Sequence, residues 1–228
     1  MLHKFKVYLK RFGWIRKMLS PLFKLKHKIL CRVRNRSIQR NGSETLIQLQ
    51  HILEGQEKQF FFDMGTLLGI VREGELLKHD MDVDIAVYVE DEQEKMKLSE
   101  YLKKSGCKHL YCYTLENHGI VEDSYLLNNI KFDVNFYKKN GETDLCYLLY
   151  VDTTLPAGRM RAVELSCDEI SGIERYEYHG CEINIPSNAE KYLCRRYGES
   201  WRVPDKNYVY WKGPSTRKIN ETGIRTEF

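Results

Sequence analysis

The chain between Phe60 and Val87 reads FFFDMGTLLGIVREGELLKHDMDVDIAV. Its three phenylalanines predict a short buried strand, and the following Asp63-Met64-Gly65-Thr66 predicts a turn into a helix that runs to Arg72. The last residues, Asp-Val-Asp-Ile-Ala-Val, predict a second strand. Because the first backbone N–H groups of a helix have no partner within it, Gly65 and Thr66 are candidates for binding a phosphate.

Two acidic residues on the second strand form the strongest candidate for a metal site. Asp82 and Asp84 are two positions apart, so their side chains project from the same face of a strand. Like charges so close together raise each other's pKa unless a cation lies between them, and hard oxygen ligands favour Mg²⁺ or Mn²⁺. The alternative is a pair of solvated acids at the end of a strand.

A third acidic residue is expected further along the chain. The order of strand, Gly-Thr turn, helix and Asp-x-Asp strand resembles the nucleotidyltransferase superfamily, in which a later strand carries another carboxylate. Lys131–Phe136 reads KFDVNF, and its alternation puts Asp133 on the polar face of such a strand. The alternative for Asp133 is a solvated position. The other predicted elements are a helix over residues 91–104 and strands over residues 108–114, 119–126, 130–137 and 145–151.

This resemblance implies an α+β fold, in which a nucleotidyltransferase-like mixed β-sheet has flanking helices. The charge pattern of the first 42 residues adds an N-terminal basic amphipathic helical arm in front of it. The resemblance also implies that Asp82, Asp84 and Asp133 hold the metal. Two longer motifs narrow it to one family. Residues 65–72, GTLLGIVR, and residues 79–84, HDMDVD, are similar to the G-T-L-L-G-x-x-R and W-D-x-D-[IV]-D signatures of the LicD and fukutin-related family.

A second region supports the same family. Residues 180–204 are similar to its carboxyl-terminal block, which reads as a strand, a Pro, a short helix and a Tyr-Gly-x-x-Trp tail. Two positions depart from the family pattern. His79 replaces the usual Trp, and Ser166-Cys167 stands where the family commonly has Phe-Pro, so the acceptor side of the site is expected to differ.

The family resemblance implies a transferase that moves a phosphorylated alcohol, such as phosphocholine, ribitol phosphate or glycerol phosphate. The donor is CDP-linked, the acceptor is a hydroxyl of a cell-surface glycan or its lipid-linked precursor, and CMP is released during capsule or teichoic acid synthesis. Asp133 is the candidate general base. Arg72 is the candidate contact to the donor diphosphate, because a guanidinium binds it bidentately. The alternative for Arg72 is a surface charge at a helix end.

The first 42 residues form a basic segment in front of a more acidic body. They contain 13 of the 36 Lys and Arg residues and none of the 32 Asp and Glu residues. Apolar residues recur there at spacings of three and four, which predicts amphipathic helices, with a break at Ser20-Pro21 and a turn at Asn41-Gly42. We therefore divide the chain into a basic helical arm, residues 1–42, and a LicD-like catalytic domain, residues 43–228.

An anionic membrane surface is the partner that this arm fits best, through residues 1–38. The chain has no apolar run long enough to span a bilayer, and charges interrupt any signal-peptide core. We therefore expect a cytoplasmic protein bound peripherally at the inner face of the membrane. The alternatives are packing of the arm on the protein itself and nucleic-acid binding, which is disfavoured because no known module is present.

Two other functions remain open. The first is a nucleotidyltransferase that acts on a small molecule and releases pyrophosphate, and the second is a catalytically silent membrane-associated assembly factor. The three acids argue for an enzyme, whereas P-loop, dinucleotide-binding and serine-hydrolase motifs are absent from the sequence. The seven cysteines include no Cys-x-x-Cys pair, which favours reduced thiols.

Overall fold

The computed structural model describes residues 13–140, 143–168 and 170–228. Eight strands form one sheet, in the order β1-β2-β5-β4-β3-β10-β7-β6, and β8 and β9 form a separate pair. The strands are β1 (Phe60–Phe62), β2 (Asp82–Tyr88), β3 (Lys108–Leu115), β4 (Gly119–Leu127), β5 (Ile130–Asn140), β6 (Thr143–Tyr150), β7 (Arg159–Asp168), β8 (Ile173–Tyr178), β9 (Cys181–Pro186) and β10 (Thr216–Glu227). The helices are α2 (Gly13–Glu54), α3 (Met64–Glu73), α4 (Glu92–Lys104), α5 (Ala189–Tyr197) and the 3₁₀ turn η1 (Tyr210–Lys212).

Six of these strands close into an antiparallel barrel, which overturns the expected fold class. β5, β4, β3, β10, β7 and β6 pair in that order, and a further pairing of β6 with β5 completes the circuit. The prediction of a nucleotidyltransferase-like mixed sheet with flanking helices is therefore wrong. The physical reason is β10, which fills the place between β3 and β7 and so lets the sheet curl back on itself.

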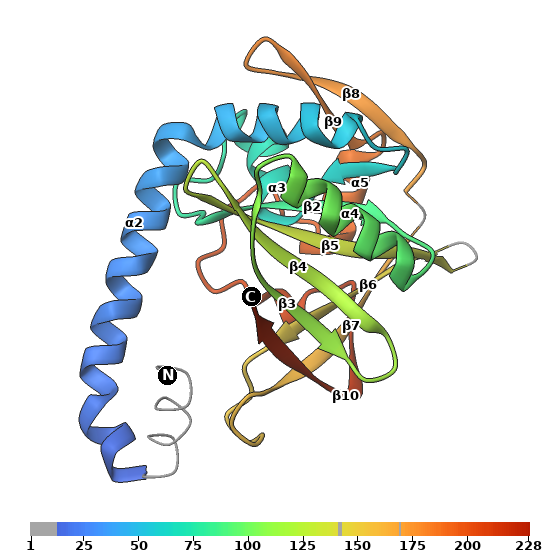
Figure 1. Ribbon diagram of the computed structural model, residues 1–228. Helices are drawn as coiled ribbons and strands as arrows, with labels where there is room; N and C mark the ends of the chain where they lie inside the picture. The colour runs from blue at the N-terminus through green and yellow to red at the C-terminus, as the bar shows by residue number, and fades with distance from the viewer. Residues whose placement is uncertain (1–12, 141–142, 169) are drawn as a thin grey trace.

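β1 and β2 extend the wall of the barrel beyond β5. β2 runs parallel to β5 and β1 runs antiparallel to β2. Alternate side chains of these strands, such as Ile85 and Val134, are fully buried in the main hydrophobic core. Helix α2 lies across this region, and the β8–β9 pair packs near β1 (Figure 1). The helix predicted over residues 91–104 and the strands predicted from residue 108 to residue 151 are confirmed by α4 and by β3 to β6.

Helix α2 is continuous from Gly13 to Glu54, so the predicted break at Ser20-Pro21 and the predicted turn at Asn41-Gly42 are wrong. Gly42 serves close packing instead of a turn. A Cβ added at this position would lie 2.7 Å from Cδ1 of Leu76. The glycine therefore lets the helix approach the segment before β2.

The two halves of α2 have opposite environments (Figure 1). Leu46, Leu49 and Leu53 in the second half are at most 1% exposed. The first half runs beside the barrel and stands apart from it in Figure 1, and four of its apolar side chains are 44–55% exposed: Leu25, Ile29, Leu30 and Val33. The prediction for residues 1–12 of the arm lies outside the described residues. Within the described ranges, no helix is long and apolar enough to cross a membrane.

Candidate active site

The polar face of β2 and β5 gathers the three predicted acids. In the parallel pairing of these strands, Asp84 lies opposite Asp133 and Asp82 lies opposite Lys131. Paired residues of adjacent strands project from the same face of a sheet, and residues two apart on one strand do likewise. The side chains of Asp82, Asp84 and Asp133 therefore share one face, opposite the apolar core.

A lysine lies between two of these carboxylates. Nζ of Lys131 donates a hydrogen bond to Oδ2 of Asp82 over 2.8 Å and another to Oδ2 of Asp133. Oγ of Ser124 on β4 donates to Oδ1 of Asp133 over 2.6 Å. Both Lys131 and Asp133 are buried. Their charges therefore interact with little screening by water.

Burial and mutual repulsion perturb the ionisation of the cluster. The pKa of Asp84 is raised well above its ordinary value, first by burial and then by the charges of Asp82 and Asp133. Burial also raises the pKa of Asp133, and Lys131 opposes that rise. Burial alone would lower the pKa of Lys131, but attraction to Asp133 and Asp82 raises it well above its ordinary value. One lysine thus faces three acids, and this excess of negative charge favours an additional cation.

The Gly-Thr turn packs directly against this cluster. Oγ1 of Thr66 accepts a hydrogen bond from the backbone N–H of Asp84 over 2.9 Å, which joins the start of α3 to β2. Gly65 lies against Asp80, because an added Cβ would be 3.3 Å from its Oδ1. Met64 has a φ of 51°, which is strained for a residue with a side chain. The predicted phosphate-binding residues Gly65 and Thr66 therefore lie at the edge of the acidic cluster.

Sequence reasoning missed two further acids of the cluster. Burial, followed by the charge of Asp82, raises the pKa of Asp80 to about 7, and its Oδ2 has no hydrogen-bond partner among the described residues. The sequence does contain a pattern that indicates Asp80, because acidic residues recur at every second position from Asp80 to Asp84. Glu122 lies on β4, and burial followed by the charge of Asp133 raises its pKa well above its ordinary value. No local pattern marks Glu122, because its position depends on the pairing of β4 with β5.

Arg72 is held inside the protein. Its side chain is 9% exposed, its Nη1 donates to the backbone carbonyl of Trp201 over 3.2 Å, and its Nη2 pairs with Glu73 over 2.8 Å. Arg72 therefore lies in the last turn of α3 with most of its side chain covered, and its contact to a donor stays a prediction. Its Nε is buried and has no hydrogen-bond partner in the part of the chain that the structure describes. This N–H is a donor that an anionic ligand could use.

A second buried polar cluster, which sequence reasoning also missed, supports the start of α3. The hydroxyls of Tyr137 and Tyr192 donate to Oδ2 and Oδ1 of Asp63, each over 2.7 Å. Burial alone would lower the pKa of Arg196, but attraction to Asp63 raises it well above its ordinary value. Asp63 and Arg196 are both buried. These contacts join β5 and α5 to the turn that carries Gly65, and no sequence motif links residues so far apart.

The residue types of the acidic cluster are suitable ligands for a divalent cation. In the structure, two of the carboxylates bind the ammonium of Lys131 instead. Asp82, Asp84 and Asp133 offer carboxylate oxygens, which are suitable ligands for Mg²⁺ or Mn²⁺. Among the residues that the structure describes, no three Asp, Glu, His or Cys side chains surround one point as a set of metal ligands. Oδ2 of Asp82 and Oδ2 of Asp133 are instead bound to the ammonium of Lys131.

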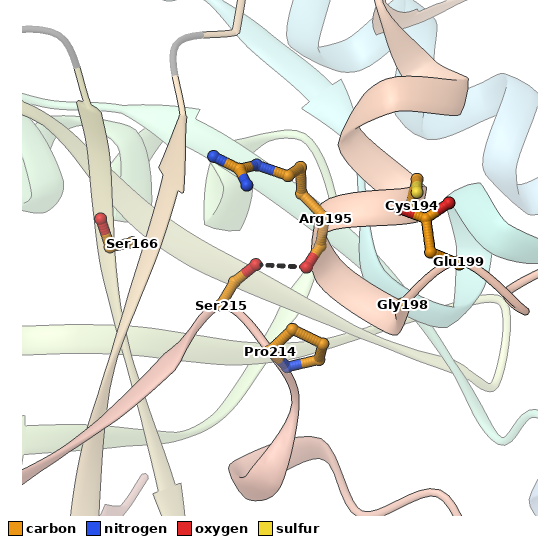
Figure 2. A pocket seen from close by; sticks show the side chains of 7 residues that line it. All are labelled: Ser166, Cys194, Arg195, Gly198, Glu199, Pro214 and Ser215. Atoms are coloured by element: carbon orange, nitrogen blue, oxygen red, sulfur yellow. Dashed lines mark hydrogen bonds between the residues drawn. The ribbon is translucent and has the colours of Figure 1, made fainter.

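A separate pocket of about 440 Å³ lies between α5, β7 and the segment that precedes β10 (Figure 2). Ser166, Arg195 and Glu199 are among its lining residues. Oγ of Ser215 donates to the backbone carbonyl of Arg195 over 2.7 Å and fixes one wall. Ser166 is also one of the two positions that depart from the family pattern. The departure therefore places a small polar side chain in the wall of a pocket.

Comparison with known proteins supports a common family for this chain. The proteins named "Ribitol-5-phosphate transferase FKTN" from Homo sapiens and Macaca fascicularis are each 23% identical to it over 187 residues, and the one from Mus musculus is 22% identical. The alignments cover 79% of this chain and 38% of each relative, so the chain spans well under half the length of these relatives. The family model described as "LicD/FKTN/FKRP, nucleotidyltransferase domain" matches residues 57–188. Because that match covers more than half of the chain and includes the acidic cluster, the chain belongs to the LicD/FKTN/FKRP family.

Proposed function

We propose that this protein transfers a phosphorylated alcohol from a CDP-linked donor to a hydroxyl of a cell-surface glycan or its lipid-linked precursor, with release of CMP. Membership of the LicD/FKTN/FKRP family supports this reaction, and so do the relatives named as ribitol-5-phosphate transferases. The observation that carries the proposal is the register that sets Asp84 beside Asp133. It gathers carboxylates on a face next to the Gly-Thr turn, where phosphates would bind.

The proposed reaction forms a P–O bond between the acceptor oxygen and the phosphorus of the alcohol phosphate, and it breaks the P–O bond to CMP. Asp133 is the proposed base that takes the proton of the acceptor hydroxyl. Asp82, Asp84 and Asp133 are the proposed ligands of Mg²⁺ or Mn²⁺, which would neutralise charge on the phosphate oxygens.

The reaction can be tested with the purified full chain, Mg²⁺ and a panel of CDP-ribitol, CDP-glycerol and CDP-choline, each with a glycan acceptor. Release of CMP that depends on both Mg²⁺ and the acceptor would support the transferase. Release of pyrophosphate from CTP and a small-molecule acceptor would favour a nucleotidyltransferase instead. Absence of both products under all conditions would favour an assembly factor.

We expect Arg72→Lys to lower kcat/KM for the CDP donor at least about tenfold, because an ammonium cannot replace both the bond to Trp201 and a guanidinium contact to a diphosphate. Steady-state kinetics with varied donor concentration provide the measurement. Arg202→Lys is the matched control, because the Arg202 side chain is 56% exposed. Unchanged donor kinetics in Arg72→Lys would show that Arg72 acts only in packing.

We extend the proposal to the exposed half of α2, as a helix that binds an anionic membrane surface. Leu25, Ile29 and Val33 recur at spacings of four, so they lie on the same side of the helix, and all three are exposed. Arg32, Arg34 and Arg36 follow in the same segment, which has no acidic residue. Apolar side chains beside a dense positive charge provide the two contributions that an interfacial helix needs.

Ile29→Glu with Val33→Glu should abolish binding to vesicles that contain an anionic lipid, because each change replaces an apolar contact with a repelled charge. The parent protein should bind less as salt rises, since each basic residue near the surface contributes about 1 kcal/mol that salt screens. The melting temperature should stay unchanged, because both side chains are exposed. Vesicle sedimentation and thermal unfolding are the measurements.

Met96→Glu is the control for this prediction, because Met96 is a similarly exposed apolar residue on α4. It should bind vesicles like the parent protein. A lower melting temperature in the α2 variant, combined with no vesicle binding by the parent, would show that the arm packs on protein instead of lipid.

A further inference from the structure

Lys131 is the feature of the acidic cluster that the proposed chemistry leaves without a role. Its side chain is 6% exposed, and its Nζ donates to one oxygen each of Asp82 and Asp133. A buried lysine carries a large desolvation cost, which only close opposite charges can offset. The lysine therefore depends on these carboxylates, and the carboxylates depend on it.

The oxygens bound by Lys131 belong to two of the three residues proposed to hold the metal. An ammonium that donates to a carboxylate oxygen occupies one of its lone pairs and neutralises part of the negative charge that would attract a metal ion. A divalent cation at the same oxygens would also be repelled by the ammonium at close range. The metal and the ammonium therefore compete for Oδ2 of Asp82 and Oδ2 of Asp133.

The surroundings of Lys131 offer its ammonium a second position. The ring of Tyr111 lies on the neighbouring wall, with its centroid 5.8 Å from Nζ, and an aromatic face attracts a cation. Glu122 on β4 is close enough for its charge to interact with that of Lys131. A flexible lysine stem can reach several positions by rotation alone. Because the guanidinium of Arg225 already lies 3.6 Å from the centroid of the Tyr111 ring, Glu122 is the group toward which the ammonium can shift within the cluster.

We propose that Lys131 is a displaceable counter-ion, whose ammonium holds the carboxylates of Asp82 and Asp133 together until a divalent cation binds and takes its place. This inference rests on the metal site of the proposed function. Taken alone, the ionised carboxylates of Asp82, Asp84 and Asp133 and the ammonium of Lys131 carry two net negative charges, which one divalent ion neutralises when the displaced ammonium remains nearby. The lysine thus keeps the empty cluster stable and weakens metal binding by competition.

The diphosphate of the donor would also affect the exchange of the Lys131 ammonium for a metal ion. An ammonium released from Asp82 and Asp133 needs a new anionic partner, and a diphosphate supplies one beside the metal. Metal and diphosphate should therefore bind cooperatively, and by linkage each should raise the affinity of the other by the same factor. Without the lysine, part of that coupling is lost.

The test is a titration of the full chain with Mn²⁺, in which free Mn²⁺ is measured by electron paramagnetic resonance. We expect Lys131→Met to bind Mn²⁺ at least about tenfold more tightly than the parent, because the competing charge is gone. Without metal, the variant should melt at a lower temperature than the parent, and Mn²⁺ should restore it. Added CDP should tighten Mn²⁺ binding more in the parent than in Lys131→Met.

Lys95→Met is the matched control, because Lys95 is another buried lysine, which donates to Glu92 and to the carbonyl of Ile120. It should also lower the melting temperature, but Mn²⁺ should not restore it and Mn²⁺ affinity should equal that of the parent. Equal or weaker Mn²⁺ binding by Lys131→Met, or no Mn²⁺ binding by either protein, would overturn the counter-ion role.

A second measurement needs no variant. Reductive methylation of the parent protein, followed by mass spectrometry, should modify Lys131 several-fold faster with Mn²⁺ than without it, because the amine is released from two hydrogen bonds. Lys95 should be modified at the same rate in both conditions, and an unchanged rate at Lys131 would overturn the proposal. If the Mn²⁺ results hold while no CDP-alcohol yields CMP, the counter-ion role stands and the proposed transferase function fails.

Discussion

Asp84→Asn, Asp82→Asn and Asp133→Asn should each lower turnover roughly a thousandfold or more, because each removes a charged oxygen ligand and keeps the shape of the side chain. The fold should survive these changes. Burial and the charges of Asp82 and Asp133 raise the pKa of Asp84, so its ionised form is unfavourable in the folded protein without a cation. Asp84→Asn should therefore keep or raise the melting temperature while it abolishes CMP release.

The control for this prediction is Asp123→Asn. Asp123 is a buried acid on β4 that pairs with His109 over 2.9 Å and accepts from Tyr125, away from the acidic cluster. Its substitution should lower the melting temperature but leave turnover close to that of the parent at temperatures where the protein is folded. Near-normal Mg²⁺-dependent turnover in any variant with two of the three cluster acids replaced would refute the three-acid site.

Arg196→Met should destabilise the protein, because it removes the buried positive charge that attracts the buried carboxylate of Asp63. Urea unfolding at neutral pH provides the measurement. The double variant Arg196→Met with Asp63→Asn should lose less free energy of unfolding than the sum of the two single variants. Asp63→Asn removes the negative charge that Arg196→Met leaves without its attracting partner. Turnover should also fall, since Asp63 begins the turn that carries Gly65 and Thr66.

Arg195→Met is the matched control on the same helix. The Arg195 side chain is exposed and extends beside the pocket (Figure 2), so its loss should cost less than that of the buried Arg196. Equal costs for Arg195→Met and Arg196→Met would show that Asp63 does not depend on Arg196.

The local sequence pattern was enough to predict the strands and the helix that carry the acidic cluster. Alternation identified the strands that carry Asp82, Asp84 and Asp133, and the Gly-Thr turn identified the start of α3. The same alternation places Lys131 two residues before Asp133, and therefore on the same face of β5. Its pairing with the carboxylates was thus open to sequence reasoning, although lysine at a strand end usually indicates solvent.

Other features depend on pairings that no local pattern contains. The barrel closes because β10 lies between β3 and β7 and β6 returns to β5, and these contacts join distant parts of the chain. Gly42 after Asn41 resembles a turn, yet its missing side chain serves packing against Leu76 within a helix. Arg196 and Asp63 carry no shared motif, so only the tertiary structure shows that their charges are neighbours.

The place of β10 in the barrel also constrains how the protein can fold during synthesis. Until residues 216–227 leave the ribosome, the barrel cannot close, and β3 and β7 each present an edge of unpaired N–H and C=O groups. Such edges readily pair with strands of other chains. The growing chain therefore has two unpaired strand edges, on β3 and β7, throughout the synthesis of β8, β9 and α5. Docking of β10 pairs both edges at once.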